Sequence, residues 1–156
     1  LEALQCPHAL YGFSGEGPDL CKVQRIKAFS DVMDDDVRKR MVHLQAGGST
    51  RLGAYVRHAT HLLSRRPEDR RVLLLLSDGR PEDGDDYRGS SGVQDSALAV
   101  RAAIRSGLFV FCVSLDGREG ASTYLQEIFG KGRFLIVERP EQLPTRLPEV
   151  LRDLVR

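Results

Sequence analysis

The sequence predicts an α/β fold in which helices flank a mostly parallel sheet. One observation behind this prediction is the apolar run of residues 72–76, which no polar residue interrupts. A strand half exposed to water would alternate, so an unbroken run is typical of a strand covered on both faces. A second apolar run spans residues 108–115. The third observation is that helical and strand patterns alternate in the second half of the chain, as a parallel sheet with crossover helices requires.

The first half of the chain predicts a hairpin and two helices. Residues 8–13 and 22–28 have strand character and are joined by a Gly/Pro loop, so we expect them to pair in antiparallel fashion. Residues 37–44 have a helical pattern that begins after three aspartates, residues 34–36, whose carboxylates favour the helix dipole. Apolar residues at helical spacing predict a second helix over residues 51–65.

The second half predicts the parallel strands and their crossover helices. Strands are expected at Arg71–Ser77, Leu108–Ser114 and residues 134–137, and helices at residues 93–104, 122–129 and 145–155. Gly107 ends the first of these helices. Pro148 is expected in the first turn of the last helix, where its missing N–H costs nothing.

Length and composition indicate a single globular domain spanning residues 1–156. The formal net charge of +1 excludes a global field that would attract nucleic acid or anionic lipid, so neither is an expected partner. No apolar run approaches the roughly 18 residues needed to span a bilayer. The three cysteines lack metal-ligand spacing, which favours a reducing, cytoplasmic location, with Cys112 as a buried free thiol.

Asp78, at the end of the first apolar run, is the leading candidate for a metal ligand. Ligands bind beyond the carboxyl ends of parallel strands, which is where Asp78 falls. Further carboxylates follow it, namely Glu82, Asp83, Asp85 and Asp86. Oxygen ligands of this kind suit a divalent cation such as Mg²⁺. The alternative is that Asp78 only shapes an Asp-Gly-x-Pro turn.

Thr50 is the second candidate ligand. It directly precedes the helix predicted at residues 51–65, so its hydroxyl either caps that helix or points at a cation, and spacing alone favours the cap. His58 and His61 lie three residues apart on the same helix, but no third ligand stands nearby in the sequence. We therefore interpret both histidines as surface residues.

These two candidates carry a resemblance to a known family. A strand that ends in Ser77-Asp78-Gly79, preceded by a Gly-Ser-Thr-Arg segment that opens a helix, is similar to the von Willebrand factor A domain. The resemblance implies a doubly wound, Rossmann-like sheet with strand order 3-2-1-4-5-6. It also implies a metal-ion-dependent adhesion site made of an Asp-x-Ser-x-Ser after the first strand, a Thr before a later helix and an Asp after the fourth strand. Thr50 matches the second element and Asp78 matches the third.

Longer segments resemble a narrower family, the bacterial accessory proteins typified by NorD and CbbO. The segments that carry this resemblance are ALYGFSG, GGSTRLGAYVRHAT, LLLLSDGRPEDGDDY, FVFCVSLD and RPEQLPTRLPEVL. The resemblance implies a MoxR-type hexameric AAA+ ATPase as partner, and a target that the pair activates or assembles: nitric oxide reductase in one branch, Rubisco in the other. It also implies that Mg²⁺, held by serines, Thr50 and Asp78, binds an acidic residue of the target.

The chain departs from the family pattern at its N-terminal side. No Asp-x-Ser-x-Ser occurs in the 156 residues, and no apolar strand precedes Leu1. Because that first strand is central in the family fold, we expect an N-terminally incomplete domain whose strands at residues 8–13 and 71–77 do not pair with each other. Residues 1–4 would then be the end of its first helix. Thr50 and Asp78 alone would bind Mg²⁺ weakly, because this ion demands near-octahedral oxygen ligation.

Two other functions stay open at this point. A strand-end aspartate with nearby acids could support metal-dependent phosphoryl transfer. Against this enzyme interpretation, the chain contains neither a P-loop nor a Gly-x-Ser-x-Gly motif. The chain could also be an α/β scaffold without a functional metal site. We favour a binding module that is not an enzyme and that captures its partner without making or breaking a bond.

Overall fold

The computed structural model describes residues 6–45, 47–84 and 86–155 of the chain. In order, the elements are β1 (Leu10–Gly15), β2 (Cys21–Lys27), α1 (Asp35–Val42), α2 (Leu52–Ser64), β3 (Arg71–Ser77), α3 (Ser90–Arg105), β4 (Leu108–Ser114), α4 (Ala121–Phe129), β5 (Phe134–Ile136), the 3-10 helix η2 (Pro140–Gln142) and α5 (Leu143–Val155). Each strand and helix predicted within the described residues is present, with its ends shifted by a few residues. The helix end predicted at residues 1–4 lies outside the described residues.

The three predicted parallel strands are confirmed. β3, β4 and β5 form one parallel sheet in that order. Arg71 pairs with Leu108 at one end of the sheet, and Ser77 pairs with Ser114 at the other. Ser114 in turn pairs with Ile136. The three strands therefore end side by side, and the segments that follow them leave the sheet along one edge.

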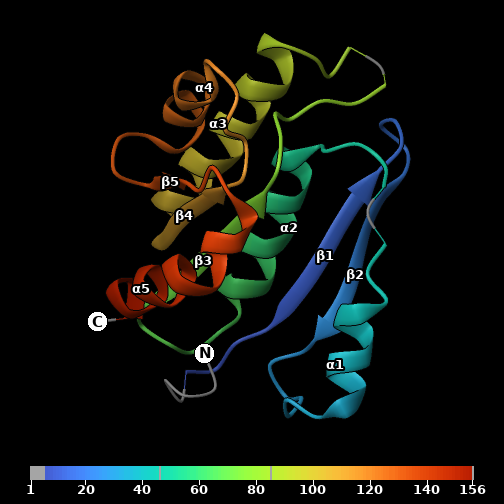
Figure 1. The fold of residues 1–156 in the computed structure, drawn as a ribbon, viewed down its shortest axis with the longest axis vertical. Coiled ribbons are helices and arrows are strands. Elements are labelled where there is room, and N and C mark those ends of the chain that lie inside the picture. Colours follow the sequence, from blue (N-terminus) through green and yellow to red (C-terminus); the bar gives the residue numbers. More distant parts are fainter. Residues whose placement is uncertain (1–5, 46, 85, 156) are drawn as a thin grey trace.

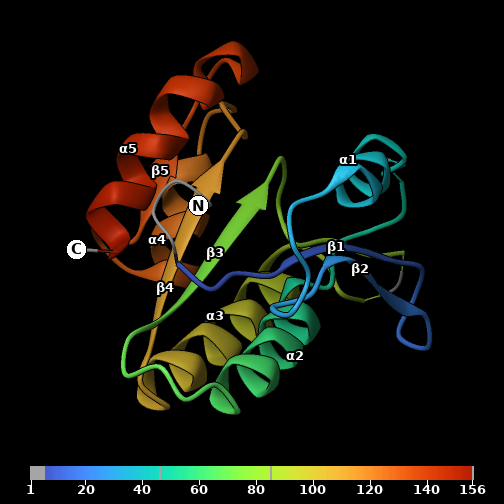
Figure 2. The same ribbon diagram turned by 90° about the horizontal axis from the view of Figure 1, so that it is seen from below.

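Helices cover both faces of this parallel sheet, which confirms the predicted α/β class. Figure 2 shows α2 and α3 along one face and α5 on the other. The hydrophobic core includes Val100 on α3, Val110 on β4 and Ile128 on α4, whose exposed fractions do not exceed 2%. Burial of these apolar side chains is the main stabilising contribution to the fold.

The predicted hairpin forms a second sheet. β1 and β2 pair in antiparallel register, from Leu10 opposite Lys27 to Gly15 opposite Cys21. The hairpin packs on α2, where the rings of Phe13 and Tyr55 lie 4.7 Å apart, and α1 lies against its other side (Figure 1). Within the described residues β2 is the only strand paired with β1, which also makes an isolated bridge from Gly15 to Ser49, and β4 is the only strand paired with β3. The expectation that β1 and β3 do not pair directly is therefore confirmed.

β3 is less covered than its unbroken apolar run predicted. Of its seven residues only Leu75 is buried, and Leu76 is 44% exposed. β4 has the covered pattern, with Val110, Cys112 and Val113 all buried. The prediction of coverage on both faces is thus correct for β4 and wrong for β3. The physical reason is that β3 has β4 on one side and no described strand on the other.

Two details at helix ends differ from the predictions. The helix α2 begins at Leu52, and its N-cap residue is Arg51, whose side chain makes no capping hydrogen bond, so the prediction that Thr50 caps this helix is wrong. The helix α5 begins at Leu143, so Pro148 lies inside it and not in its first turn. The 3-10 helix η2 runs directly into α5, which is why the helix starts earlier than Thr145.

Candidate functional site

Asp78 lies where the sequence analysis placed it. It is the first residue after β3, at the carboxyl edge of the parallel sheet, and its side chain is exposed. Among the described residues it has no hydrogen-bond or ion-pair partner. A carboxylate that stabilises its own turn would accept hydrogen bonds from neighbouring backbone amides. Asp78 does not do this with any described residue, so its oxygens stay available to a ligand.

Thr50 lies on the segment beside the Asp78 loop. Its backbone N–H donates to the carbonyl oxygen of Glu82 over 2.8 Å, which joins the two segments. The Thr50 side chain is half-buried, and its hydroxyl makes no hydrogen bond within the described part of the chain. No direct contact between the Thr50 and Asp78 side chains is present in that part of the chain either.

The hydroxyl of Tyr87 explains why α2 does not need Thr50 as a cap. It accepts a hydrogen bond of 3.2 Å from the backbone N–H of Gly53, in the first turn of the helix. The same hydroxyl donates to Asp95 over 2.8 Å. A Cβ at position 53 would clash with the carboxylate of Asp95 in this arrangement, so a larger residue there would have to displace that side chain. Tyr87, which is distant in the sequence, thus supplies the hydrogen-bond acceptor for the first turn of α2 that the spacing predicted from Thr50.

Asp83 is a structural residue and not a free ligand. Its side chain is 1% exposed and forms an ion pair with Arg51. It also accepts hydrogen bonds from the hydroxyl of Ser49 and from the backbone N–H groups of Gly17 and Gly84. These donors, with the Ser49 hydroxyl first, hold the pKa of Asp83 well below its usual range. Because Ser49 and Arg51 flank Thr50, Asp83 fixes the segment that carries Thr50.

Asp116, the acid that follows the carboxyl end of β4, also has its carboxylate oxygens engaged by other side chains. Its side chain is 3% exposed. It accepts hydrogen bonds from Nε and Nη2 of Arg118, at 2.7 and 2.9 Å, and from the hydroxyl of Tyr124 at 2.8 Å. Arg118 first, and Tyr124 after it, lower the pKa of Asp116 from its usual 3.8 to about 2. Neither Asp83 nor Asp116 could bind a metal without losing these partners.

Besides the exposed carboxylates of Glu82 and Asp86, and Asp85, which lies outside the described residues, the groups left for a cation are the Thr50 hydroxyl and the Asp78 carboxylate. Both are oxygen donors of the type that Mg²⁺ prefers. No group of three or more His, Cys, Asp or Glu side chains arranged to hold a metal occurs within residues 6–45, 47–84 and 86–155. Two oxygen donors fit part of an octahedral site and leave most of its positions to other groups.

The other residues considered from the sequence have ordinary structural positions. Asp34 is the N-cap of α1 and accepts a hydrogen bond of 2.9 Å from the N–H of Val37, as its dipole-matched place predicted. His58 and His61 are exposed on α2. Cys112 is a buried free thiol, and burial raises its pKa to about 12. No helix within the described residues has the length and apolar character needed to cross a bilayer.

Sequence reasoning missed the partners that occupy the buried acids. Arg51 stands next to the candidate Thr50, and Arg118 stands two residues after Asp116, so each arginine is close to a site residue or to its acid in the sequence. The available signal was that each acid has an arginine able to reach it. Tyr87, on the loop before α3, and Tyr124, on α4, gave no such signal, because they meet their partners only in the folded chain.

Together these features define a Rossmann-like α/β module whose two candidate ligands, Thr50 and Asp78, are not engaged by any described residue. The chain is 43% identical, over its whole length, to an uncharacterized protein of Pseudomonas aeruginosa, of which it covers 25%. It is 39% identical to proteins named NorD from Stutzerimonas stutzeri, over 91% of this chain, and from Brucella melitensis, over 85% of it. It covers 23% and 21% of these two relatives, so the chain spans about a quarter or less of the length of each relative. No protein-family profile matches the chain. The similarity supports the NorD-type part of the resemblance.

Proposed function

We propose that the chain is the protein-binding module of a NorD-type accessory protein, in which a divalent cation captures an acidic residue of a target enzyme. The single observation that carries this proposal is the state of the two candidate ligands. Thr50 and Asp78 present oxygen atoms that no described residue engages, while the neighbouring acids Asp83 and Asp116 are fully occupied.

Thr50 and Asp78 would hold the ion, which when bound would supply a positive charge with an open coordination position for a partner carboxylate. The backbone hydrogen bond from Thr50 to Glu82 positions Thr50 for this role. Its neighbours Ser49 and Arg51 hold the same segment in place through a hydrogen bond and an ion pair to Asp83. Asp78 acts from the turn after β3, either directly or through water.

A von Willebrand factor A-type site would need further oxygen ligands and a strand to carry them. The outer edges of β1 and β3 support this part of the proposal, because within the described residues each has a single strand partner, and β1 adds only the isolated bridge of Gly15 to Ser49. An extended segment between them would satisfy both rows of backbone groups. Its end would come out at the same edge as Asp78, where serine hydroxyls could complete the ion's coordination.

The proposed target is nitric oxide reductase, and the proposed working partner is a MoxR-type AAA+ ATPase. Similarity to proteins named NorD supports the nitric oxide reductase branch over the Rubisco branch. In this scheme the ATPase supplies the energy of ATP hydrolysis, and the module binds the target protein and so determines which target is acted on. The module makes and breaks no bond, so it is not an enzyme, and the complete protein acts in the cytoplasm.

The experiment that tests the metal site is Mn²⁺ binding by the full-length protein, measured by electron paramagnetic resonance with Mg²⁺ as competitor. The wild type should bind the ion, and Asp78→Ala should lose at least about tenfold in affinity. Asp86→Ala is the matched control, because Asp86 is exposed on the same loop and should change affinity little. Equal affinities in wild type and Asp78→Ala would show that Asp78 is no ligand.

A further inference from the structure

Arg118 is held in place by a buried acid and yet faces solvent. Its side chain is 71% exposed, whereas the Asp116 side chain beneath it is 3% exposed. Asp116 fixes the guanidinium through Nε at 2.7 Å and Nη2 at 2.9 Å. Tyr124, from α4, adds its hydroxyl at 2.8 Å and so fixes Asp116 in turn. An exposed arginine normally samples many rotamers, and this one is restrained to a single orientation.

The guanidinium keeps unused donors in this orientation. An arginine side chain has five N–H donors in a fixed fork. Asp116 engages one on Nε and one on Nη2, and no other acceptor among the described residues engages the remaining donors. These remaining donors include both N–H groups of Nη1, beside the second N–H group of Nη2. This pair of nitrogens is the edge of the fork that binds a carboxylate bidentately.

Arg118 lies directly beside the candidate metal ligand. A Cβ built on Gly79 would lie 3.9 Å from Nη2 of Arg118, so the guanidinium packs against the turn that follows Asp78. The sheet register explains this contact, because Ser77 and Ser114 are paired at the ends of β3 and β4. The segments that carry Asp78 and Arg118 thus leave neighbouring strands at the same edge.

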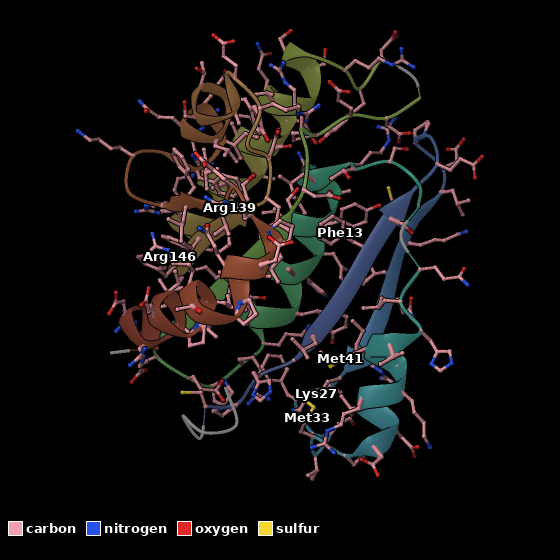
Figure 3. The ribbon with its side chains drawn as sticks, in the orientation of Figure 1. Phe13, Lys27, Met33, Met41, Arg139 and Arg146 are labelled. Carbon is pink, nitrogen blue, oxygen red and sulfur yellow. The ribbon has the colours of Figure 1, made fainter. Side chains whose placement is uncertain are left out.

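A second exposed arginine contacts the residue that holds Asp116. Arg80 is exposed, and its guanidinium lies 5.5 Å from the ring centroid of Tyr124, the residue that also holds Asp116. Arg139, exposed beyond β5 at the same edge, is labelled in Figure 3. Each of the three parallel strands is therefore followed by an exposed arginine, and the one after β4 has its free donors oriented beforehand.

We propose that Arg118 binds a second carboxylate of the target segment whose first acidic residue occupies the metal. This inference rests on the proposed metal-dependent capture and adds that the target presents two nearby acids and not one. The positive charge of Arg118 and its free fork fit a carboxylate, and its fixed orientation lowers the entropy lost on binding. Arg80 supports the same segment through charge.

The test uses the full-length protein and fluorescein-labelled peptides that contain one Asp followed, at one to four positions, by Glu. Each peptide is paired with a version that has Gln in place of Glu. The wild type with Mg²⁺ should bind the best Glu peptide at least about tenfold more tightly than its Gln version. Arg118→Gln should reduce this preference to about onefold, and Arg118→Lys should keep only part of it, because lysine lacks the fork.

The control variant is Arg146→Gln on α5 (Figure 3), because Arg146 is about half-exposed and already paired with Glu149. It should keep the wild-type preference. Mn²⁺ affinity and circular dichroism should be the same in all variants, which would exclude misfolding as a cause. A wild type without preference for Glu, or an Arg118→Gln variant that keeps it, would overturn the inference. If chelator leaves peptide binding unchanged while Arg118→Gln removes the preference for Glu over Gln, the proposed metal dependence is wrong and the proposed binding of a carboxylate by Arg118 is supported.

Discussion

Replacing Thr50 with valine separates the two roles that a hydroxyl at this position can have. Valine keeps the shape of threonine and removes only the hydroxyl. Loss of a true helix cap costs about 1 kcal/mol of stability, within a range of roughly 0.5–2. Because the Thr50 hydroxyl bonds no described residue, Thr50→Val should cost less than about 0.5 kcal/mol. In the metal site the same change removes a ligand and should weaken Mn²⁺ binding at least about tenfold.

Tyr87→Phe is the matched comparison, because Tyr87 supplies the hydroxyl that accepts the N–H of Gly53 and donates to Asp95. It should lower the local stability of α2 by about 1 kcal/mol or more, and should leave Mn²⁺ affinity close to that of the wild type. The assay is amide hydrogen exchange at Gly53 in the metal-free full-length protein. A loss of 1 kcal/mol appears there as exchange about fivefold faster.

The result that would refute this reasoning is the reverse pattern. Fivefold faster exchange in Thr50→Val, together with unchanged Mn²⁺ affinity, would show that Thr50 caps α2 and is no ligand. Equal exchange in Tyr87→Phe and wild type would show that Tyr87 does not support the start of the helix.

Three further predictions concern stability and reactivity. The pKa of Asp116 is lowered from its usual 3.8 to about 2, so the stability that Asp116 contributes is present above pH 4 and is lost as the pH falls towards 2. Arg118→Gln removes the main cause of that shift and should move acid unfolding, followed by circular dichroism, to higher pH. Ile128→Ala opens a cavity at a site that is 2% exposed and should lower the free energy of unfolding in urea by about 2–5 kcal/mol. Cys21 is exposed and should react with a thiol reagent in the native protein, whereas Cys112 is buried with a raised pKa and should react only after unfolding.

The sequence predicted the elements well where the signal was local and continuous. The apolar runs of β3 and β4 predicted parallel strands, and the aspartates at residues 34–36 predicted the start of α1, because strand patterning and capping depend on residues close in sequence. The loose cover of β3 could not be predicted from its own residues, since exposure depends on what lies beside a strand. Leu76 is apolar and nevertheless 44% exposed.

The candidate site shows the same division. Asp78 was found because a strand end is visible in the sequence. The roles of Asp83 and Asp116 were not visible, since an isolated acidic residue resembles a ligand until its partners are known. In the folded chain Arg51 pairs with Asp83 and Arg118 pairs with Asp116, so both acids have structural roles. Ser49 and Tyr124 donate further hydrogen bonds to these acids, and only the fold brings them close enough to do so. The sequence likewise favoured Thr50 as the cap of α2, because the residue that accepts the N–H of Gly53, Tyr87, lies in a distant segment.

The central claim is that capture of the target depends on a metal held by Asp78. It is tested most directly by binding of nitric oxide reductase to the immobilised full-length protein, with Mg²⁺, with chelator, and with Mg²⁺ restored. The account predicts that wild type retains the reductase with Mg²⁺, loses it with chelator and regains it when Mg²⁺ is restored, while Asp78→Ala retains little under any condition. Retention of the reductase by the wild type in the presence of chelator would contradict the account.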